Sequence, residues 1–171
     1  MTLEQSLAQL IEICLIHERR MIHGLKRINH LMPMTSEKLE QMSDDDYLCL
    51  DGVVGRFEKL QDTLGQKIFS RILKLEEEFE ISESFLDRLH KLEKLKVLDS
   101  TDAWIELRKL RNELSHEYAC MESEELSTSI NTFVAACQDL LKIWHDVERY
   151  VASIKPSLPA STGQKDSPNS F

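Results

Sequence analysis

The chain has 171 residues, of which 42% are apolar, and this length and composition fit a single domain with a sizeable core. Glycine and proline are scarce, with five and four residues, which favours an all-α fold. The formal net charge of −9 argues against a protein that binds nucleic acid in bulk through a basic surface, although it allows a local basic groove. We expect an antiparallel bundle of about five helices over residues 1–154 and a flexible tail over residues 155–171.

Neither an export signal nor a membrane span is predicted. The N-terminal stretch carries Glu4, Glu12 and Glu18 and lacks a basic segment ahead of an apolar run. No apolar run approaches the roughly 18–20 residues that a membrane helix requires. The cysteines form no C-x-x-C pair, so we interpret them as small apolar residues in a reducing compartment: Cys14, Cys49, Cys120 and Cys137. The sequence therefore predicts a cytoplasmic protein without a metal or another cofactor.

Apolar residues recur at three- and four-residue steps along the first half of the chain and predict two long helices. The first runs from Thr2, an expected N-cap, to Met32 before Pro33. A connector over 33–46 holds one short helix at most, and the second long helix runs over about 44–78. The glycines within it predict close helix packing or a bend: Gly52, Gly55 and Gly65.

The second half of the chain predicts three more helices. One runs from the N-cap Ser82 to about Leu98, and its basic face is either a solvated surface or a patch that contacts phosphates. Another runs over about 102–121, and the last over about 123–154. On a helical wheel, the core-facing residues of the 102–121 helix are Ala103, Leu107, Leu110, Leu114 and Met121.

The same helix carries a run of polar residues at a spacing that suggests chemistry: Arg111, Asn112, His116 and Tyr118. A His near its ordinary pKa of about 6.5 transfers protons at neutral pH, and an Arg stabilises charge on a phosphate. These groups suit RNA cleavage without a metal, in which the 2′-OH attacks the adjacent phosphate. However, His116 lies about 140° from Arg111 on a straight helix, so the set converges only if Arg111 stretches, the helix distorts or a second copy completes it.

The R-x4-H-x-Y pattern resembles the motif of HEPN domains, and most closely that of HepT-like toxins. The resemblance implies a helical homodimer that acts as an endoribonuclease toxin of a type VII-like pair, with Arg111 and His116 as the catalytic pair and Asn112 in support. It also implies a minimal nucleotidyltransferase antitoxin as partner, which transfers AMP to Tyr118. RNA is then the substrate, with no DNA expected, and the candidate RNA contacts are Arg56, Arg108, Lys91 and Lys94.

A second interpretation assigns these residues no catalytic role. Arg, His and Tyr are common on solvated helix surfaces, and each residue of the motif is explained singly by ordinary solvation. The chain is then a non-catalytic helical binding module that docks onto a nucleotidyltransferase or another protein. A metal-dependent enzyme is the weakest alternative, because no cluster of His, Cys, Asp and Glu supplies a complete ligand set at a recognisable spacing.

Overall fold

The computed structural model describes residues 2–114 and 121–155, and all regular secondary structure in these ranges is helical, which confirms the all-α prediction. No helix within them is long and apolar enough to span a membrane. Nearly all of the predicted tail lies outside the described residues. The elements are α1 (Leu3–Ile28), a 3₁₀ turn η1 (Asn29–Leu31), α2 (Ser36–Glu40), α3 (Asp44–Asp62), a π-helical stretch η2 (Thr63–Ile68), α4 (Phe69–Leu75), α5 (Phe85–Lys94), α6 (Thr101–Leu114) and α7 (Ser123–Ile154).

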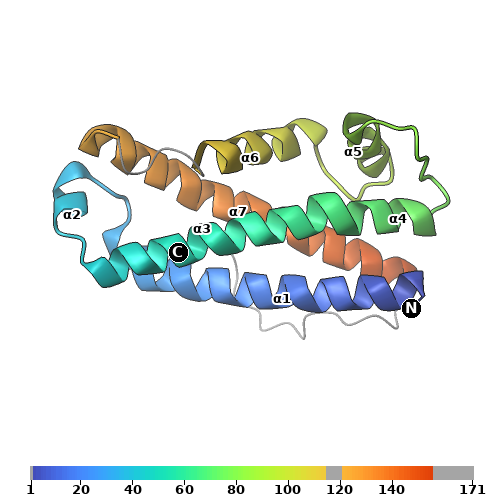
Figure 1. Cartoon of the computed structure of the whole chain (residues 1–171), viewed down its shortest axis with the longest axis horizontal. Helices are drawn as coiled ribbons and strands as arrows, with labels where there is room; N and C mark the ends of the chain where they lie inside the picture. Colours follow the sequence, from blue (N-terminus) through green and yellow to red (C-terminus); the bar gives the residue numbers. More distant parts are fainter. Residues whose placement is uncertain (1, 115–120, 156–171) are drawn as a thin grey trace.

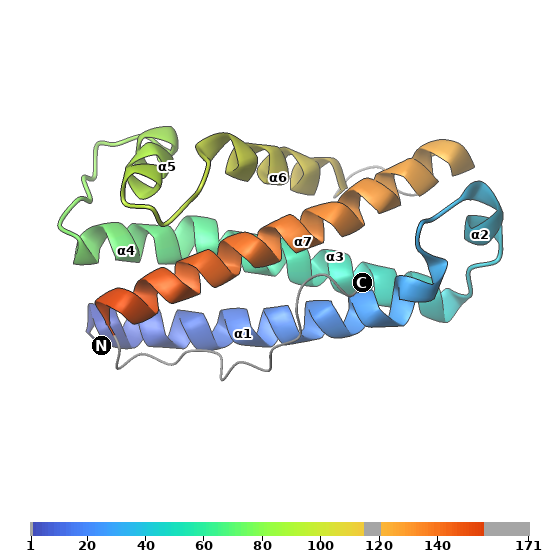
Figure 2. The same ribbon diagram turned by 180° about the vertical axis from the view of Figure 1, so that it is seen from behind.

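Three long helical rods form the body of the bundle. The elements α3, η2 and α4 join into one continuous helix that runs antiparallel to α1, and α7 crosses these two rods on one side (Figures 1 and 2). Helices α5 and α6 pack along the edge of the α3–α4 rod away from α1 (Figure 1). The described residues thus form the expected bundle of about five helices, with α2 as a short addition.

The helix starts follow local capping signals in the sequence. The Thr2 side chain accepts a hydrogen bond from the backbone of Gln5, whose side chain in turn accepts one from the backbone of Thr2, as predicted. The same reciprocal pair begins α5, but there the N-cap is Ser84 and not the predicted Ser82. The reason is Asp87, whose carboxylate accepts hydrogen bonds from the backbone and the hydroxyl of Ser84.

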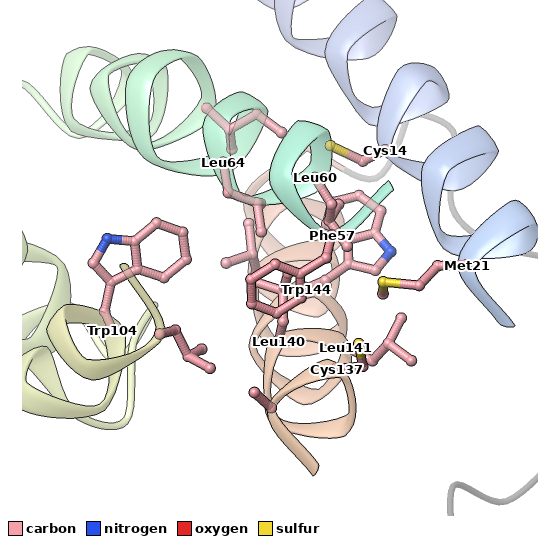
Figure 3. Close-up of a cluster of buried hydrophobic side chains, with 14 of the residues drawn as sticks. Cys14, Met21, Phe57, Leu60, Leu64, Trp104, Cys137, Leu140, Leu141 and Trp144 are labelled. Carbon is pink, nitrogen blue, oxygen red and sulfur yellow. The ribbon is translucent and has the colours of Figure 1, made fainter. Parts of the chain in front are cut away.

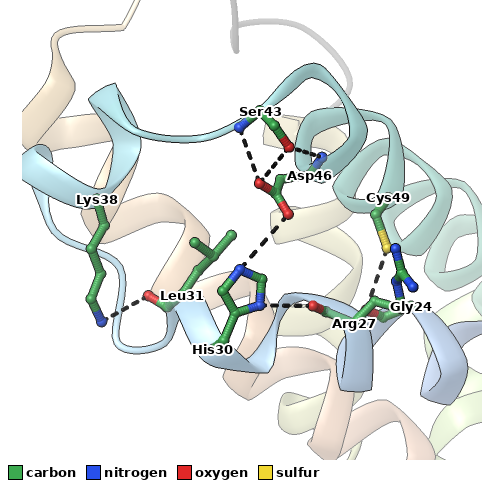
Figure 4. Close-up of polar contacts among 8 residues, drawn as sticks. All are labelled: Gly24, Arg27, His30, Leu31, Lys38, Ser43, Asp46 and Cys49. Atoms are coloured by element: carbon green, nitrogen blue, oxygen red, sulfur yellow. Dashed lines mark hydrogen bonds and ion pairs between the residues drawn. The ribbon is translucent and has the colours of Figure 1, made fainter.

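The corner between α1 and α3 is held by a second set of local polar contacts (Figure 4). His30 donates through Nδ1 to the carbonyl oxygen of Arg27 at 3.0 Å, and its Nε2 lies 3.9 Å from Asp46. Asp46 also accepts hydrogen bonds from the hydroxyl and backbone of Ser43, which lower the pKa of its carboxyl group. These contacts give His30 a structural role at the helix end.

The centre of the core contains a tryptophan whose polar atom is fully paired. Trp144 of α7 is buried beside Phe57, and its indole nitrogen donates to the Glu18 carboxylate at 2.8 Å (Figure 3). His145 Nε2 lies 2.6 Å from the other oxygen of Glu18, and this hydrogen bond raises the pKa of His145. Glu18 thereby links α1 to α7 from inside the bundle.

Of the four cysteines, three fall within the described residues and all three are free thiols. Cys14 and Cys137 are fully buried in the core, whereas Cys49 is half-buried. Burial raises the pKa of Cys14 to about 12 and also raises the pKa of Cys137. The two buried thiols therefore act as small apolar residues, and Cys120 lies outside the described residues.

Candidate functional site: a basic pocket beside α6

A pocket of about 340 Å³ opens where the α3–η2–α4 rod meets α5 and α6. Its volume is at the lower end of the range for small-molecule sites, which is about 300–1,000 Å³. Ten residues from three separate stretches of the chain line it: Gln61, Asp62, Gly65, Gln66, Ser70, Phe85, Arg88, Trp104, Arg108 and Arg111.

The floor of the pocket depends on a close approach between η2 and α6. A Cβ atom added at Gly65 would lie 2.8 Å from Cζ2 of Trp104, closer than real side chains pack. Trp104 also packs edge-on against Phe69, with ring centroids 4.7 Å apart. The predicted close helix packing is therefore present at Gly65, where the partner is an aromatic ring, but not at Gly52 or Gly55, where no atom lies within 4 Å of an added Cβ. π-helical turns occur frequently at functional sites.

Three arginines supply the charge of the pocket. The guanidinium of Arg108 lies 4.8 Å from the ring centroid of Phe85, and that of Arg88 lies 4.7 Å from the ring centroid of Phe79. Within the described residues, neither Arg88 nor Arg108 forms an ion pair with a carboxylate. The faces of the two rings hold these cations by cation–π attraction and leave their charge unneutralised.

Arg111 is the exception, because it lies against the one carboxylate of the pocket lining. Its Nη2 donates to Asp62 at 3.0 Å, and its Nη1 donates to the side-chain oxygen of Asn112 at 3.3 Å. Asp62 accepts a further hydrogen bond from Gln66 at 3.2 Å. The formal charge of the lining is therefore +2, from three arginines and one aspartate, in a chain whose net charge is −9.

Two buried side chains in the lining keep a nitrogen atom without a hydrogen-bond partner among the described residues. They are Trp104, through Nε1, and Gln61, through Nε2. Trp104 is 1% exposed and Gln61 is 3% exposed. A buried donor without an acceptor costs about 1–3 kcal/mol, so native structures contain few of them. An indole nitrogen can only donate, so Trp104 holds a buried donor next to the pocket without an acceptor among the described residues.

The structure describes only two of the four motif residues predicted to form the site. Arg111 lies at the pocket and Asn112 is beside it, whereas His116 and Tyr118 lie outside the described residues. The proposed convergence of His116 with Arg111 therefore stays a prediction. Among the described residues, no group of three or more His, Cys, Asp and Glu is placed to hold a metal ion.

The four candidate RNA contacts occupy different environments. Arg108 lines the pocket, but Arg56 lies on α3 with its Nη1 3.4 Å from His17 of α1. Lys91 donates to the carbonyl oxygen of Glu78 and forms ion pairs with three glutamates around the start of α5, while Lys94 is exposed. A common basic surface is therefore not formed by these four residues, and Arg108 is the one that shares a site with Arg111.

The helical wheel drawn from the sequence placed α6 in a slightly wrong rotation. Trp104 is fully buried, whereas the predicted core residue Ala103 is exposed. Leu107 is buried and Leu110 is partly buried, as expected. The signal that would have found this face is Trp104 itself, since it falls three residues before Leu107 on a helix that needs a broad apolar stripe. The other pocket residues that the sequence did not assign to a site are Gln61, Asp62, Gln66, Ser70 and Phe85.

Comparison with known proteins gives one significant match. The model of the family described as "Nucleotidyltransferase substrate binding protein like" matches residues 3–145, which include every residue of the pocket lining. No curated protein and no solved structure matches the chain significantly.

This match corrects the resemblance to HEPN domains and HepT-like toxins, which was wrong as a family assignment. The assignment rested on a few residues of one helix, and so short a pattern arises by chance in roughly one chain in a hundred of this length. The matching family model covers most of the chain, from α1 into α7, and is therefore the more specific observation.

Proposed function

We propose a function from one premise: the chain belongs to the nucleotidyltransferase substrate binding protein-like family. The protein is a helical binding partner of a nucleotidyltransferase, and the pocket between α3, α5 and α6 holds the molecule to which the nucleotide is transferred. In this arrangement the partner carries the nucleotidyl-transfer chemistry, and the chain described here selects and orients the acceptor. This is the binding-module interpretation of the sequence, with a ligand site added.

The observation that carries the proposal is the position of the pocket within the family match. The lining residues lie between 61 and 111, and the family model extends on both sides of them. The pocket combines unneutralised arginines, an aromatic wall and unpaired buried donors, and such convergent polar groups in a concavity are typical of ligand sites. The bundle around it is well packed, so the site is held by rigid helices.

The test is reconstitution with small nucleotidyltransferases encoded in the same genome. Each is mixed with the full chain and examined by size-exclusion chromatography with light scattering, and transfer is followed with a radiolabelled nucleoside triphosphate and a cell extract as acceptor source. We expect a stable complex with one of them and labelling that requires both proteins. Absence of a complex with every candidate enzyme would contradict the proposal.

The pocket itself is tested in the same assay with one variant. Arg108→Ala removes a solvent-exposed guanidinium from the pocket and changes no buried group. The complex should form as before, while labelling of the acceptor falls. Unchanged labelling would separate the pocket from the acceptor site and leave only the docking function.

A second candidate is metal-independent RNA cleavage by Arg111 and His116 in a homodimer. The observation that favours it is the site of Arg111, which shares a basic pocket with Arg88 and Arg108. Charge of this kind stabilises a phosphate during attack by the 2′-OH. The ion pair between Arg111 and Asp62 works in the opposite direction, because it neutralises the guanidinium that the reaction needs.

RNA cleavage by the purified protein in EDTA separates the two candidates. Wild type is compared with His116→Ala, and intact mass is recorded on both, because AMP on Tyr118 would mask activity. Cleavage by wild type alone supports the nuclease. No cleavage by a protein of unmodified mass leaves the binding partner as the function.

A further inference from the structure

The charge of the pocket narrows the class of molecule that it binds. Its lining contains three guanidinium groups and one carboxylate, and two of the guanidinium groups have no carboxylate partner in the described chain. An arginine presents several N–H donors in a plane and pairs two oxygens of a phosphate at once. A carboxylate ligand offers two acceptor oxygens, whereas a terminal phosphate offers three.

The volume of the pocket restricts the size of the ligand. About 340 Å³ is much more than a phosphate ion fills, so the pocket has room for an organic group of modest size beside the anion. That group would lie against the walls formed by Phe85 and by the α3–η2–α4 rod, where Ser70 and Gln66 offer neutral hydrogen bonds.

We propose that the pocket binds a small phosphomonoester, with Arg88, Arg108 and Arg111 around its phosphate group. This inference rests on the proposed function, since it names the acceptor's chemical class. The ion pair between Asp62 and Arg111 is the internal competitor: the ligand phosphate replaces the Asp62 carboxylate at Arg111 when it binds.

The experiment is titration calorimetry on the full chain alone, with three probes at constant ionic strength. Inorganic phosphate tests the anion site, ribose 5-phosphate tests the phosphomonoester, and ribose is the uncharged counterpart. We expect saturable binding of ribose 5-phosphate, weaker binding of inorganic phosphate and no binding of ribose. No saturable binding of either phosphate probe overturns the proposal.

A matched pair of variants on α6 distinguishes specific binding in the pocket from nonspecific attraction to positive charge. Arg108→Ala and Lys109→Ala remove one positive charge each from neighbouring exposed positions, but Lys109 pairs with Glu106 and does not line the pocket. Arg108→Ala should weaken ribose 5-phosphate binding by about tenfold or more, the usual effect of losing a charge-assisted hydrogen bond. Lys109→Ala should leave it unchanged, and equal weakening by both variants contradicts the proposal.

Asp62→Asn tests the competition at Arg111. It removes the negative charge that the ligand phosphate must displace, so binding should become tighter by severalfold. Weaker binding by Asp62→Asn would show that Asp62 positions Arg111 rather than competing for it, and would overturn that part of the inference.

These results are independent of the nucleotidyltransferase. If the complex forms and neither phosphate probe binds, the phosphomonoester inference fails and the docking function stands. If the phosphate probes bind and no complex forms, the pocket is an anion-binding site, and the proposed partnership with a nucleotidyltransferase fails.

Discussion

The two tryptophans of the chain mark two regions with different physical characters. Trp144 lies at the crossing of α1, α3 and α7, and Trp104 lies where α6 meets η2 (Figure 3). Both are buried, but the indole nitrogen of Trp144 donates to Glu18, whereas that of Trp104 has no partner among the described residues. A buried donor without an acceptor lowers stability, so the polar groups around Trp104 are less completely paired than those around Trp144.

The largest expected effect comes from exchanging each tryptophan for phenylalanine. Trp144→Phe removes the donor to a partly buried carboxylate, while Trp104→Phe removes a donor that has no acceptor among the described residues. Trp144→Phe should therefore lower the free energy of unfolding by about 1.5–3 kcal/mol more than Trp104→Phe does, the usual value of a hydrogen bond to a charged group. Urea denaturation followed by circular dichroism measures both, and equal losses would remove the contrast between the regions.

A smaller effect is expected where the rod touches Trp104. Gly65→Ala places a Cβ 2.8 Å from the indole ring, and the overpacking should cost about 1–2 kcal/mol after the gain in helix propensity. Gly55→Ala is the matched control on the same rod, since no atom lies within 4 Å of the added Cβ, and it should stabilise by about 0.5–1 kcal/mol. Stabilisation by both variants would show that the Trp104 ring shifts to accommodate the added Cβ at little energetic cost.

The smallest effect is a pH dependence in the core region. The hydrogen bond to Glu18 raises the pKa of His145 above 6.5, so its contribution to stability is complete below pH 6.5 and is lost as the pH rises through the folded-state pKa. The side chain is 41% exposed, so screening keeps the contribution below about 1 kcal/mol. The stability difference between wild type and His145→Gln should therefore shrink as the pH rises from 5.5 to about 8.

His17 serves as a control, because its effect on stability should depend on pH in the opposite direction to that of His145. Burial and then the neighbouring Arg56 lower its pKa below 6.5, so its neutral form is favoured and the folded state loses stability as the pH falls through this range. The free energy of unfolding of wild type relative to that of His17→Gln should accordingly decrease as the pH falls. A parallel trend for both histidine variants would contradict the assignment of the pKa shifts.

The sequence predicted the parts of the fold that depend on neighbours in the chain. The cap at Thr2, the aspartate-rich start of α3 and the bounds of α7 follow from residues within a few positions of one another. The start of α5 was missed by two residues because Ser82 and Ser84 both resemble N-caps, and only the carboxylate of Asp87 distinguishes them.

The pocket was beyond prediction because its parts come from distant stretches. Arg111 was identified from its motif, but its partner Asp62 lies 49 residues earlier, on a different helix. The wheel of α6 omitted Trp104, so the residue that joins α6 to η2 was absent from the expected core. Arg108 was named as an RNA contact together with three residues that lie outside the pocket lining, because charge alone does not tell which side chains share a site.

The π-helical stretch η2 has a consequence for how this chain tolerates changes in length. Four aliphatic residues follow one another at four-residue steps and are all fully buried: Leu60, Leu64, Ile68 and Ile72. In a regular α-helix three such steps would turn the last side chain about 120° away from the first. Hydrogen bonds that span five residues wind the backbone more slowly, and this keeps the four side chains on one line. Deletion of a single residue from η2 would restore the regular pitch and leave the buried face of α4 within about 20° of its present orientation. A deletion in the regular part of α3 would instead rotate α4 by about 100°, so η2 is the part of this rod that best tolerates the loss of one residue.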